Sequence, residues 1–321
     1  MKKKVGVIVI CFGLFLLSAL TPAKNITPGV NAHREVAVTF DDLPSSYGNG
    51  DLKRLTDITT RLLQSLKSNN VPAIGFVNEN KLYANGELKQ RTALLRMWLD
   101  AGLGLGNHTF SHISIDTVPL ETYKKDVIRG ETVTKKLLAE RGMKLRYFRH
   151  TQLQTGPTIE YKRGLERFLA ARGYTIAPVT IDNNDFIFAA LYGDAKVRGD
   201  KDTMKRLAEA YVPYMESVFD FFEKLSMNTL GYEVKQTLLL HANDLNADHF
   251  DDLVLMMKRR GYRFISLADA LKDKAYRLPD AQVMKGLSWI HRWRLAKGLP
   301  LEMEPTEPEF VTQLFKARQG W

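Results

Sequence analysis

Two neighbouring carboxylates, Asp41 and Asp42, follow an apolar run at 36–40 that predicts a buried strand. Adjacent side chains leave a strand end in different directions, and a β/α barrel places its active site at the carboxyl ends of its strands. One carboxylate could therefore bind a metal ion while the other faces a water. A helix N-cap or a turn is the simpler interpretation, because aspartate is common at both. The pair by itself is a weak signal.

Two histidines, His108 and His112, lie four residues apart just after a second predicted strand at 103–106. In a helix or a tight turn, this spacing lets both imidazoles face one metal ion. Two neutral imidazoles and a carboxylate form a common catalytic zinc site, which leaves positions open for water and substrate. The alternative is a pair of surface or capping histidines, because this spacing also arises often by chance.

Two more polar clusters follow predicted strands at 145–148 and 174–179. Arg149 ends the first and could hold a catalytic carboxylate through a bidentate contact, although a structural salt bridge is its commoner role. Asp182 and Asp185 follow the second strand, where a polar loop is the alternative. A calcium loop is disfavoured, because its regular glutamate is missing.

His241 follows the apolar run at 237–240, which predicts another strand. It could be a satisfied core histidine. It could equally be a general acid, since the pKa of histidine lies near neutral pH and Asp185 could raise it and orient the ring. All five clusters follow predicted strands, so we expect them on one face of a barrel, at the ends of its strands.

The strands that end in these residues alternate with predicted helices. Helical spacing of apolar residues predicts helices at 52–68, 92–101, 121–141, 158–172 and 248–260, and a further strand is predicted at 73–77. Ser266 is expected to cap a helix through Leu271, after a strand at 263–265. Repeated β–α units with short turns imply parallel strands covered by helices. With this many units, a barrel is expected rather than an open sheet.

The first residues have the pattern of a secretory signal peptide, with lysines at 2–4, an apolar run at 5–17, and plausible cleavage after Ala19 or Ala23. We therefore predict a signal peptide at 1–23 and an exported protein, periplasmic or extracellular. An uncleaved N-terminal anchor is the alternative. Cys11, the only cysteine, lies in this leader. Any metal must then be held by histidine, aspartate or glutamate.

The formal net charge is +10, from 46 Lys and Arg against 36 Asp and Glu. Such a charge could attract nucleic acid, anionic lipid or an acidic polymer. The basic residues are scattered and no nucleic-acid motif accompanies them, so we expect neither nucleic acid nor, beyond the leader, a membrane as partner. Attraction to an anionic cell-wall polymer fits this charge better.

The rest of the chain is predicted to form one catalytic domain at 24–280, with a helical insertion at about 201–227. A C-terminal extension at 281–321 follows it. The tryptophans of this extension are expected to pack against the domain, and a carbohydrate-binding platform is the alternative. We expect a monomer.

Over roughly 35–271, the sequence resembles the polysaccharide deacetylases of carbohydrate esterase family 4, which share the NodB-homology domain. Five motifs of that family occur in order: Thr39-Phe40-Asp41-Asp42, His108-Thr109-Phe110-Ser111-His112, Phe148-Arg149, Asp182-Asn183-Asn184-Asp185-Phe186 and Leu239-Leu240-His241. The set is highly specific, although any one motif is not. The resemblance implies an α/β fold, a distorted (β/α) barrel of about seven parallel strands.

The resemblance also implies a metal centre. Asp42, His108 and His112 would bind a divalent metal, zinc in preference to Co²⁺, Ni²⁺ or Mn²⁺, and Asp41 would be the general base.

Three further roles follow from the resemblance. Arg149 would orient Asp41, Asp185 would tune His241, and His241 would protonate the leaving amine.

The acetyl pocket would be lined by Leu239 and by Phe186, which stands in place of the family's usual tryptophan. The sequence departs from the family after Arg149, where His150-Thr151-Gln152-Leu153 replaces Pro-Pro-Tyr-Gly. In relatives, the backbone N–H at the tyrosine position helps to form the oxyanion hole. A backbone donor can survive a change of side chain, so this departure bears on substrate choice more than on activity.

We therefore expect a hydrolase of non-peptide carbon–nitrogen bonds. It would remove N-acetyl groups from an amino-sugar polysaccharide or oligosaccharide, such as peptidoglycan, a chitin-like chain or an exopolysaccharide. An O-acetyl esterase or a non-sugar amide hydrolase on the same scaffold shares all five motifs and stays open. A catalytically silent carbohydrate-binding protein is the more remote alternative, because none of the expected metal ligands is lost.

Overall fold

The computed structural model describes residues 34–47 and 50–320, together with Met1. The predicted signal peptide at 1–23 lies almost wholly outside the described residues and stays a prediction. No helix within the described part of the chain is long and apolar enough to span a bilayer.

The core of the protein is a seven-stranded parallel sheet in the order β5-β4-β3-β2-β1-β6, with β7 paired to the start of β1. The strands are β1 (Arg34–Leu43), β2 (Ile74–Val77), β3 (Gly104–Asn107), β4 (Tyr147–Phe148), β5 (Thr175–Ile176), β6 (Gln236–His241) and β7 (Tyr262–Phe264). A bridge between Ile181 and Leu238 brings the segment after β5 back to β6. The sheet thus curls toward closure, and the expected distorted barrel of about seven parallel strands is confirmed.

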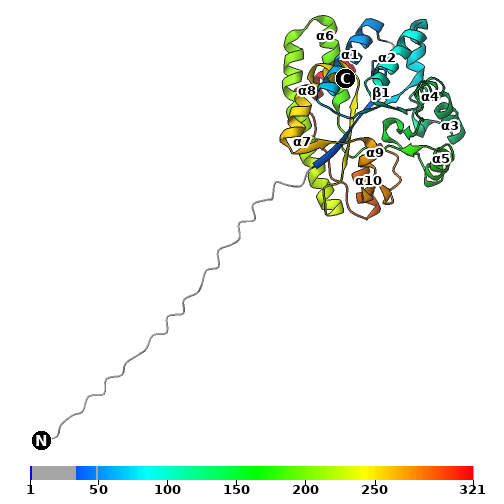
Figure 1. Ribbon diagram of the computed structural model, residues 1–321. Helices are drawn as coiled ribbons and strands as arrows, with labels where there is room; N and C mark the ends of the chain where they lie inside the picture. Colours follow the sequence, from blue (N-terminus) through cyan, green and yellow to red (C-terminus); the bar gives the residue numbers. More distant parts are fainter. Residues whose placement is uncertain (2–33, 48–49, 321) are drawn as a thin grey trace. The chain divides into compact units, whose positions relative to one another are not determined.

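Helices surround the strands, and β1 crosses the middle of the view in Figure 1. The α-helices are α1 (Leu52–Ser68), α2 (Leu88–Asp100), α3 (Leu120–Arg129), α4 (Thr132–Ala139), α5 (Ile159–Ala171), α6 (Asp185–Arg198), α7 (Lys201–Leu230), α8 (Asp244–Arg259), α9 (Leu267–Ala270), α10 (Trp289–Ala296) and α11 (Glu309–Arg318). Short 3₁₀ helices are η1 (Glu79–Gly86), η2 (Ile115–Thr117), η3 (Thr151–Leu153) and η4 (Lys274–Arg277).

The central strand is anchored by aromatic packing close to its carboxyl end. Phe40 is fully buried, and its ring centroid lies 5.7 Å from that of Trp98 on α2 and 5.7 Å from that of Phe250 on α8. Burial of a side chain of this size stabilises the fold by about 1.5–3 kcal/mol. The residue that precedes Asp41 is therefore held rigidly between two helices.

The prediction of a single helix at 121–141 is wrong. The segment forms two helices, α3 and α4, which are separated by Gly130 and Glu131. A Cβ atom at Gly130 would lie 2.6 Å from the backbone of Thr109. Because glycine has no Cβ, Gly130 lets the chain come this close to the turn that carries the two predicted histidine ligands. Asp126 of α3 also accepts hydrogen bonds from the backbone N–H and the hydroxyl of Ser111. The strand expected at 174–179 is also shorter, and only β5 forms.

The region 185–230 forms two consecutive helices. The helical stretch expected at 201–227 is α7, which begins at Lys201 and ends at Leu230. The preceding helix, α6, was not predicted. Gly199 joins α6 to α7 in a left-handed conformation, with φ at 71°, which glycine adopts without a steric penalty.

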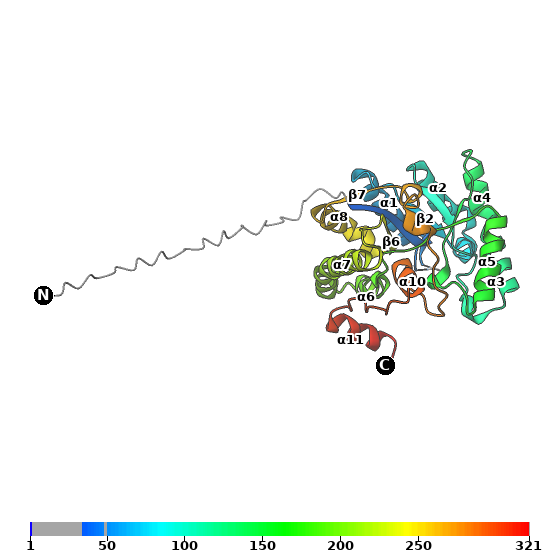
Figure 2. The ribbon, with the colours of Figure 1, turned by 90° about the horizontal axis from the view of Figure 1, so that it is seen from below.

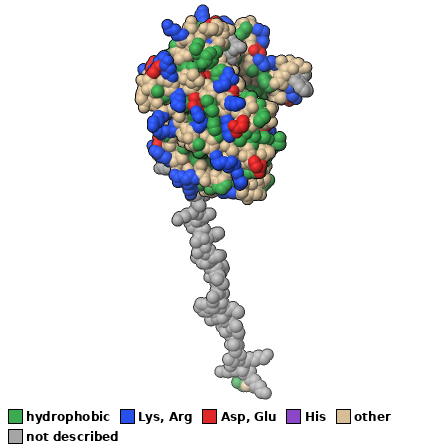
Figure 3. Space-filling model, turned by 90° about the vertical axis from the view of Figure 1, so that its right-hand side faces the viewer, with side chains coloured by type: hydrophobic (Ala, Val, Ile, Leu, Met, Phe, Trp, Pro, Cys, Tyr) green, Lys and Arg blue, Asp and Glu red, His purple; other side chains and the backbone are tan. Residues whose placement is uncertain are grey.

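The C-terminal extension contains α10 and α11. Trp289 and Trp293 of α10 are 6% and 1% exposed, so their rings are part of the core. Figure 2 shows α11 beside α6, and Arg318 of α11 donates a 2.7 Å hydrogen bond to Asp194 of α6. In Figure 3, Lys and Arg side chains are spread over the visible face rather than gathered in one patch.

Candidate active site

The two carboxylates lie inside β1 rather than after it, because the strand continues to Leu43. The register between β1 and β2 shifts between Phe40 and Leu43, and Asp42 has a φ of 70°. Such a bulge places an extra residue in one strand and redirects its side chains. Both Asp41 and Asp42 consequently line the same cavity, although neighbours in a regular strand point to opposite faces.

The two histidines lie in a tight turn after β3, not in a helix. Thr109 and His112 have φ values of 67° and 54°. Nε2 of His108 and Nε2 of His112 each lie 3.6 Å from Oδ1 of Asp42. One ligand atom from each of the three residues lies within 4.8 Å of the others. The structure therefore brings the three predicted ligands together.

The chemistry of this cluster fits a divalent metal ion. Oδ1 of Asp42 is buried and accepts no hydrogen bond from the described residues. Nδ1 of His108 lies 2.9 Å from the carbonyl oxygen of Arg149 and donates to it, which leaves the Nε2 lone pair directed at the cluster. Ligands of one tetrahedral zinc lie about 3.3–3.6 Å apart. Burial lowers the pKa of both histidines, so each ring is in the neutral form that binds metal.

Lys81 of η1 completes this side of the site, and no sequence motif signalled it. Its Nζ lies 3.3 Å from Oδ2 of Asp42 and donates to the Asp42 carbonyl oxygen at 3.1 Å. Burial alone would raise the pKa of Asp42. The nearby positive charge of Lys81 opposes burial, so the pKa of Asp42 lies below its ordinary value and the ligand stays anionic.

Asp41 is 3% exposed and lies beside the metal-binding cluster. Nη1 of Arg149 is 3.5 Å from Oδ2 of Asp41, while Nη2 donates to Thr39 Oγ1 at 2.9 Å. The expected bidentate contact is therefore wrong, because Thr39 takes the second arm of the guanidinium. Burial raises the pKa of Asp41 to about 6, and the charge of Arg149 opposes this rise. Asp41 is thus a base whose pKa lies close to neutral pH.

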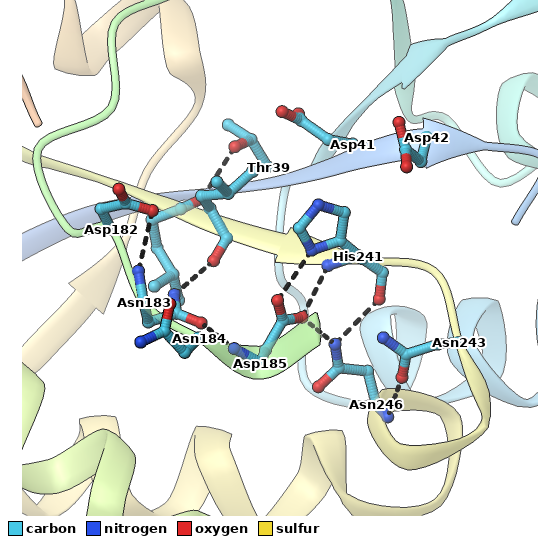
Figure 4. Close-up of polar contacts among 12 residues, drawn as sticks. Thr39, Asp41, Asp42, Asp182, Asn183, Asn184, Asp185, His241, Asn243 and Asn246 are labelled. Carbon is cyan, nitrogen blue, oxygen red and sulfur yellow. Dashed lines mark hydrogen bonds and ion pairs between the residues drawn. The ribbon is translucent and has the colours of Figure 1, made fainter. Parts of the chain in front are cut away.

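His241 of β6 and Asp185 of α6 form a tight pair on the other side of the cavity (Figure 4). Nδ1 of His241 lies 2.7 Å from Oδ1 of Asp185, and the His241 backbone N–H donates to Oδ2 at 2.9 Å. Burial would lower the pKa of His241, but the charge of Asp185 and its hydrogen bond outweigh burial and raise it to about 9. His241 is therefore protonated at neutral pH, and its Nε2 is left for a substrate.

Asn246 of α8 supports this pair and was missed in the sequence. Its Nδ2 donates to Oδ2 of Asp185 and to the carbonyl oxygen of His241, both at 2.8 Å. The only local signal is a capping pattern, because Oδ1 of Asn243 accepts from the Asn246 backbone N–H at 2.9 Å. The pattern indicates a helix start but not a contact with Asp185, which comes from a different helix.

These groups surround a cavity of about 740 Å³. Seven of the predicted site residues line it: Asp41, Asp42, His108, His112, Phe186, Leu239 and His241. Arg149 and Asp185 are fully buried behind Asp41 and His241. Phe186 is 47% exposed, and its ring packs edge-on against Phe315 of α11. The cavity wall also includes Gln152 and Leu153, where the sequence departs from the family's third motif. Arg318 lines it as well, which the sequence did not indicate.

The family model described as polysaccharide deacetylase matches residues 29–164. This match confirms the resemblance to that family and covers the first three of the five motifs. No curated protein matches the chain.

Several solved structures are similar to the chain. A polysaccharide deacetylase from Bacillus cereus is 17% identical with a TM-score of 0.49, over 73% of this chain and 91% of its own. The peptidoglycan deacetylase PdaC from Bacillus subtilis is 20% identical with a TM-score of 0.45, over 77% and 94%. A mutant of a CE4-family pseudoenzyme from Bacillus anthracis is 16% identical with a TM-score of 0.48, over 75% and 68%.

Proposed function

We propose that this protein is a metal-dependent deacetylase that hydrolyses N-acetyl groups of an amino-sugar polysaccharide or oligosaccharide. One observation carries the proposal. A buried carboxylate with a raised pKa, a three-ligand cluster and a protonated histidine all line one cavity. Amide hydrolysis needs a base for the attacking water, stabilisation of the oxyanion and an acid for the leaving nitrogen.

Asp42, His108 and His112 would hold the metal through one carboxylate oxygen and the two Nε2 atoms. When bound there, a divalent ion supplies a Lewis acid that polarises the acetyl carbonyl and acidifies a water. Asp41 accepts the proton of the attacking water, whose oxygen bonds to the acetyl carbon. Arg149 and burial hold Asp41 at the cavity wall, and the raised pKa makes it a stronger base than an exposed aspartate.

His241 supplies the proton that the leaving nitrogen requires. An amide nitrogen leaves poorly as an anion, so the carbon–nitrogen bond breaks as Nε2 of His241 delivers its proton. The products are acetate and a free amine. Asp185 keeps the Nδ1 proton in place through its 2.7 Å contact, which fixes the ring and favours the protonated form. Leu239 is 7% exposed in the cavity wall and offers an apolar surface to the acetyl methyl group.

The predicted leader supports a further part of the proposal, export to the periplasm or the cell exterior, where cell-wall polymers lie. N-terminal sequencing of the protein recovered from cell fractions tests this. A mature terminus near residue 20 or 24 is expected, and an intact leader in the cytoplasmic fraction would contradict export.

The function is tested by acetate release from chitin oligomers, peptidoglycan and acetylxylan, with the full chain loaded with zinc. We expect release from the N-acetylated substrates, and loss of release after chelation that is restored by added metal. Release from acetylxylan alone would favour an O-acetyl esterase. No release from any substrate by protein with one bound zinc would contradict the proposal and favour a silent binding protein.

A further inference from the structure

One wall of the catalytic cavity is a loop in a strained conformation. Gln152 and Leu153 both have a φ of 53°, in the left-handed region that side chains with a Cβ rarely adopt. Both residues line the cavity. They follow Arg149, at the positions where the sequence departs from the family's third motif. Two strained residues in sequence persist only when their surroundings hold them, so the neighbours of this loop are informative.

Arg292 of α10 holds this loop from behind. Its guanidinium is fully buried, Nη2 donates to the Leu153 carbonyl oxygen at 2.7 Å, and Nη1 donates to Thr155 Oγ1 at 3.1 Å. It also donates to the carbonyl oxygens of Leu287 and Ala281, both at 3.2 Å. No carboxylate among the described residues forms an ion pair with it. A buried cation without an ion pair depends on such acceptors, and two of its four are in the strained loop.

Other residues of the C-terminal extension contact the same loop. A Cβ atom at Gly286 would lie 1.9 Å from the carbonyl oxygen of Gln152, so only glycine permits this approach. Nε2 of Gln282 donates to the carbonyl oxygen of Gly156 at 2.8 Å. The ring of Trp289 stacks on His150 with 6.1 Å between centroids. Contacts from several points of the extension therefore converge on the segment 150–156.

We infer that the C-terminal extension is a positioning element of the active site, which acts through Arg292. Arg292 holds the loop 150–155 in its left-handed conformation and so keeps Gln152 and Leu153 at the cavity wall. The extension lies outside the region 29–164 that matches the family model. Arg292 touches neither the metal-binding cluster nor the cavity, so it is a positioning residue. The effect on catalysis rests on the proposed function, but the effect on the loop does not.

The test compares Arg292→Lys with a matched control on the same helix. Arg294 is also buried, but it contacts Pro300, Glu302 and Thr229 and not the loop. Lysine keeps the charge and lacks the planar fork that reaches several acceptors. We expect Arg292→Lys to lower kcat on the order of 10²-fold, because a small displacement of residues that line an active site can have an effect of this size. Zinc affinity should be unchanged. Arg294→Lys should lower Tm and leave kcat within about twofold of the wild type.

Hydrogen–deuterium exchange supplies a readout that does not depend on activity. Peptides that span 149–157 should exchange about tenfold faster or more in the zinc-loaded Arg292→Lys variant, because the loop can then open locally. In Arg294→Lys the same peptides should exchange at the wild-type rate. The inference would be overturned if Arg292→Lys exchanged at the wild-type rate and kept the wild-type kcat. An equal loss of kcat in Arg292→Lys and Arg294→Lys would also overturn it.

Gly286→Ala keeps the inference testable if Arg292→Lys does not fold. This variant removes no hydrogen bond and only pushes on the Gln152 carbonyl. We expect a lower kcat and faster exchange at 149–157, and wild-type values of both would overturn the inference. If the wild-type protein releases no acetate from any substrate, the proposed function fails, and the exchange measurements still decide whether the extension holds the loop.

Discussion

The two sides of the catalytic cavity treat their buried carboxylates in opposite ways. Beside the histidine cluster, Oδ1 of Asp41 and Oδ1 of Asp42 are buried and accept no hydrogen bond from the described residues. On the far side, both oxygens of Asp185 are occupied by His241 and Asn246. A buried acceptor left open costs about 1–3 kcal/mol. The first side is therefore arranged to bind something, whereas the second is complete by itself and sets the pKa of a histidine.

The largest effect is expected from loss of the anionic ligand, Asp42, beside the two histidines. Asp42→Ala leaves only two imidazoles, so bound zinc should fall from one per chain toward none. Acetate release should then fall on the order of 10³-fold or more, because the polarising ion is lost. Metal analysis and a kinetic assay measure both. Asp194→Ala is the control, since Asp194 also lines the cavity but lies away from the cluster, paired with Arg318. Full zinc content in Asp42→Ala would sink the assignment.

His241→Ala should separate the two sides, because it removes the proton donor and no metal ligand. We expect wild-type zinc content and a kcat lowered by about 10²–10⁴-fold. His249→Ala is the control, since its ring pairs with the exposed Asp252. Loss of zinc in His241→Ala would contradict the separation of binding from proton transfer.

A change in pH dependence follows from Asp185→Asn. Asp41 must be ionised to act as a base, so the rate should rise with pH through its pKa of about 6. His241 must be protonated to act as an acid, so the rate should fall above its pKa of about 9. Bound metal adds positive charge and moves both limbs to lower pH.

In Asp185→Asn the charge that raises the pKa of His241 is gone while burial still lowers it. The alkaline limb should therefore move to lower pH than in the equally loaded wild type, and the acid limb should move much less. A pH profile of kcat/KM measures the shift. An alkaline limb that stays in place would mean that a group other than His241 is the acid.

The smallest effect is expected at the rim formed by α11. Arg318→Ala removes an ion pair with Asp194 in which the side chains are 44% and 41% exposed. Exposed pairs of this kind contribute about 0–1 kcal/mol to stability, so Tm should hardly change. Because Arg318 lines the cavity, we expect KM to rise by about twofold to fivefold for long oligosaccharides and to stay unchanged for short ones, as for a rim contact. If KM is the same in Arg318→Ala and in the wild type for substrates of every length, the substrate does not reach α11.

Local patterns predicted much of the fold. The helix expected at 52–68 matches α1 at both ends, because its apolar residues repeat at helical spacing and Asp51 caps its first turn. The helix α6 was missed because Asp182 and Asp185 indicated a polar loop, and because α6 buries residues on several sides instead of one. The break at Gly130 depends on a contact with Thr109, which no local pattern reports.

The sequence by itself determined which residues are candidates for metal ligands, acid and base, because these groups must be of particular types and follow strands whose ends meet at one edge of a parallel sheet. Only the tertiary structure decided their surroundings. The contacts of Lys81 with Asp42, of Asn246 with Asp185 and of Arg292 with Leu153 each join distant segments. Such contacts carry no period and no local signature, since they arise from how whole elements pack. They nevertheless set the charge of a ligand, the orientation of an acid and the conformation of a wall.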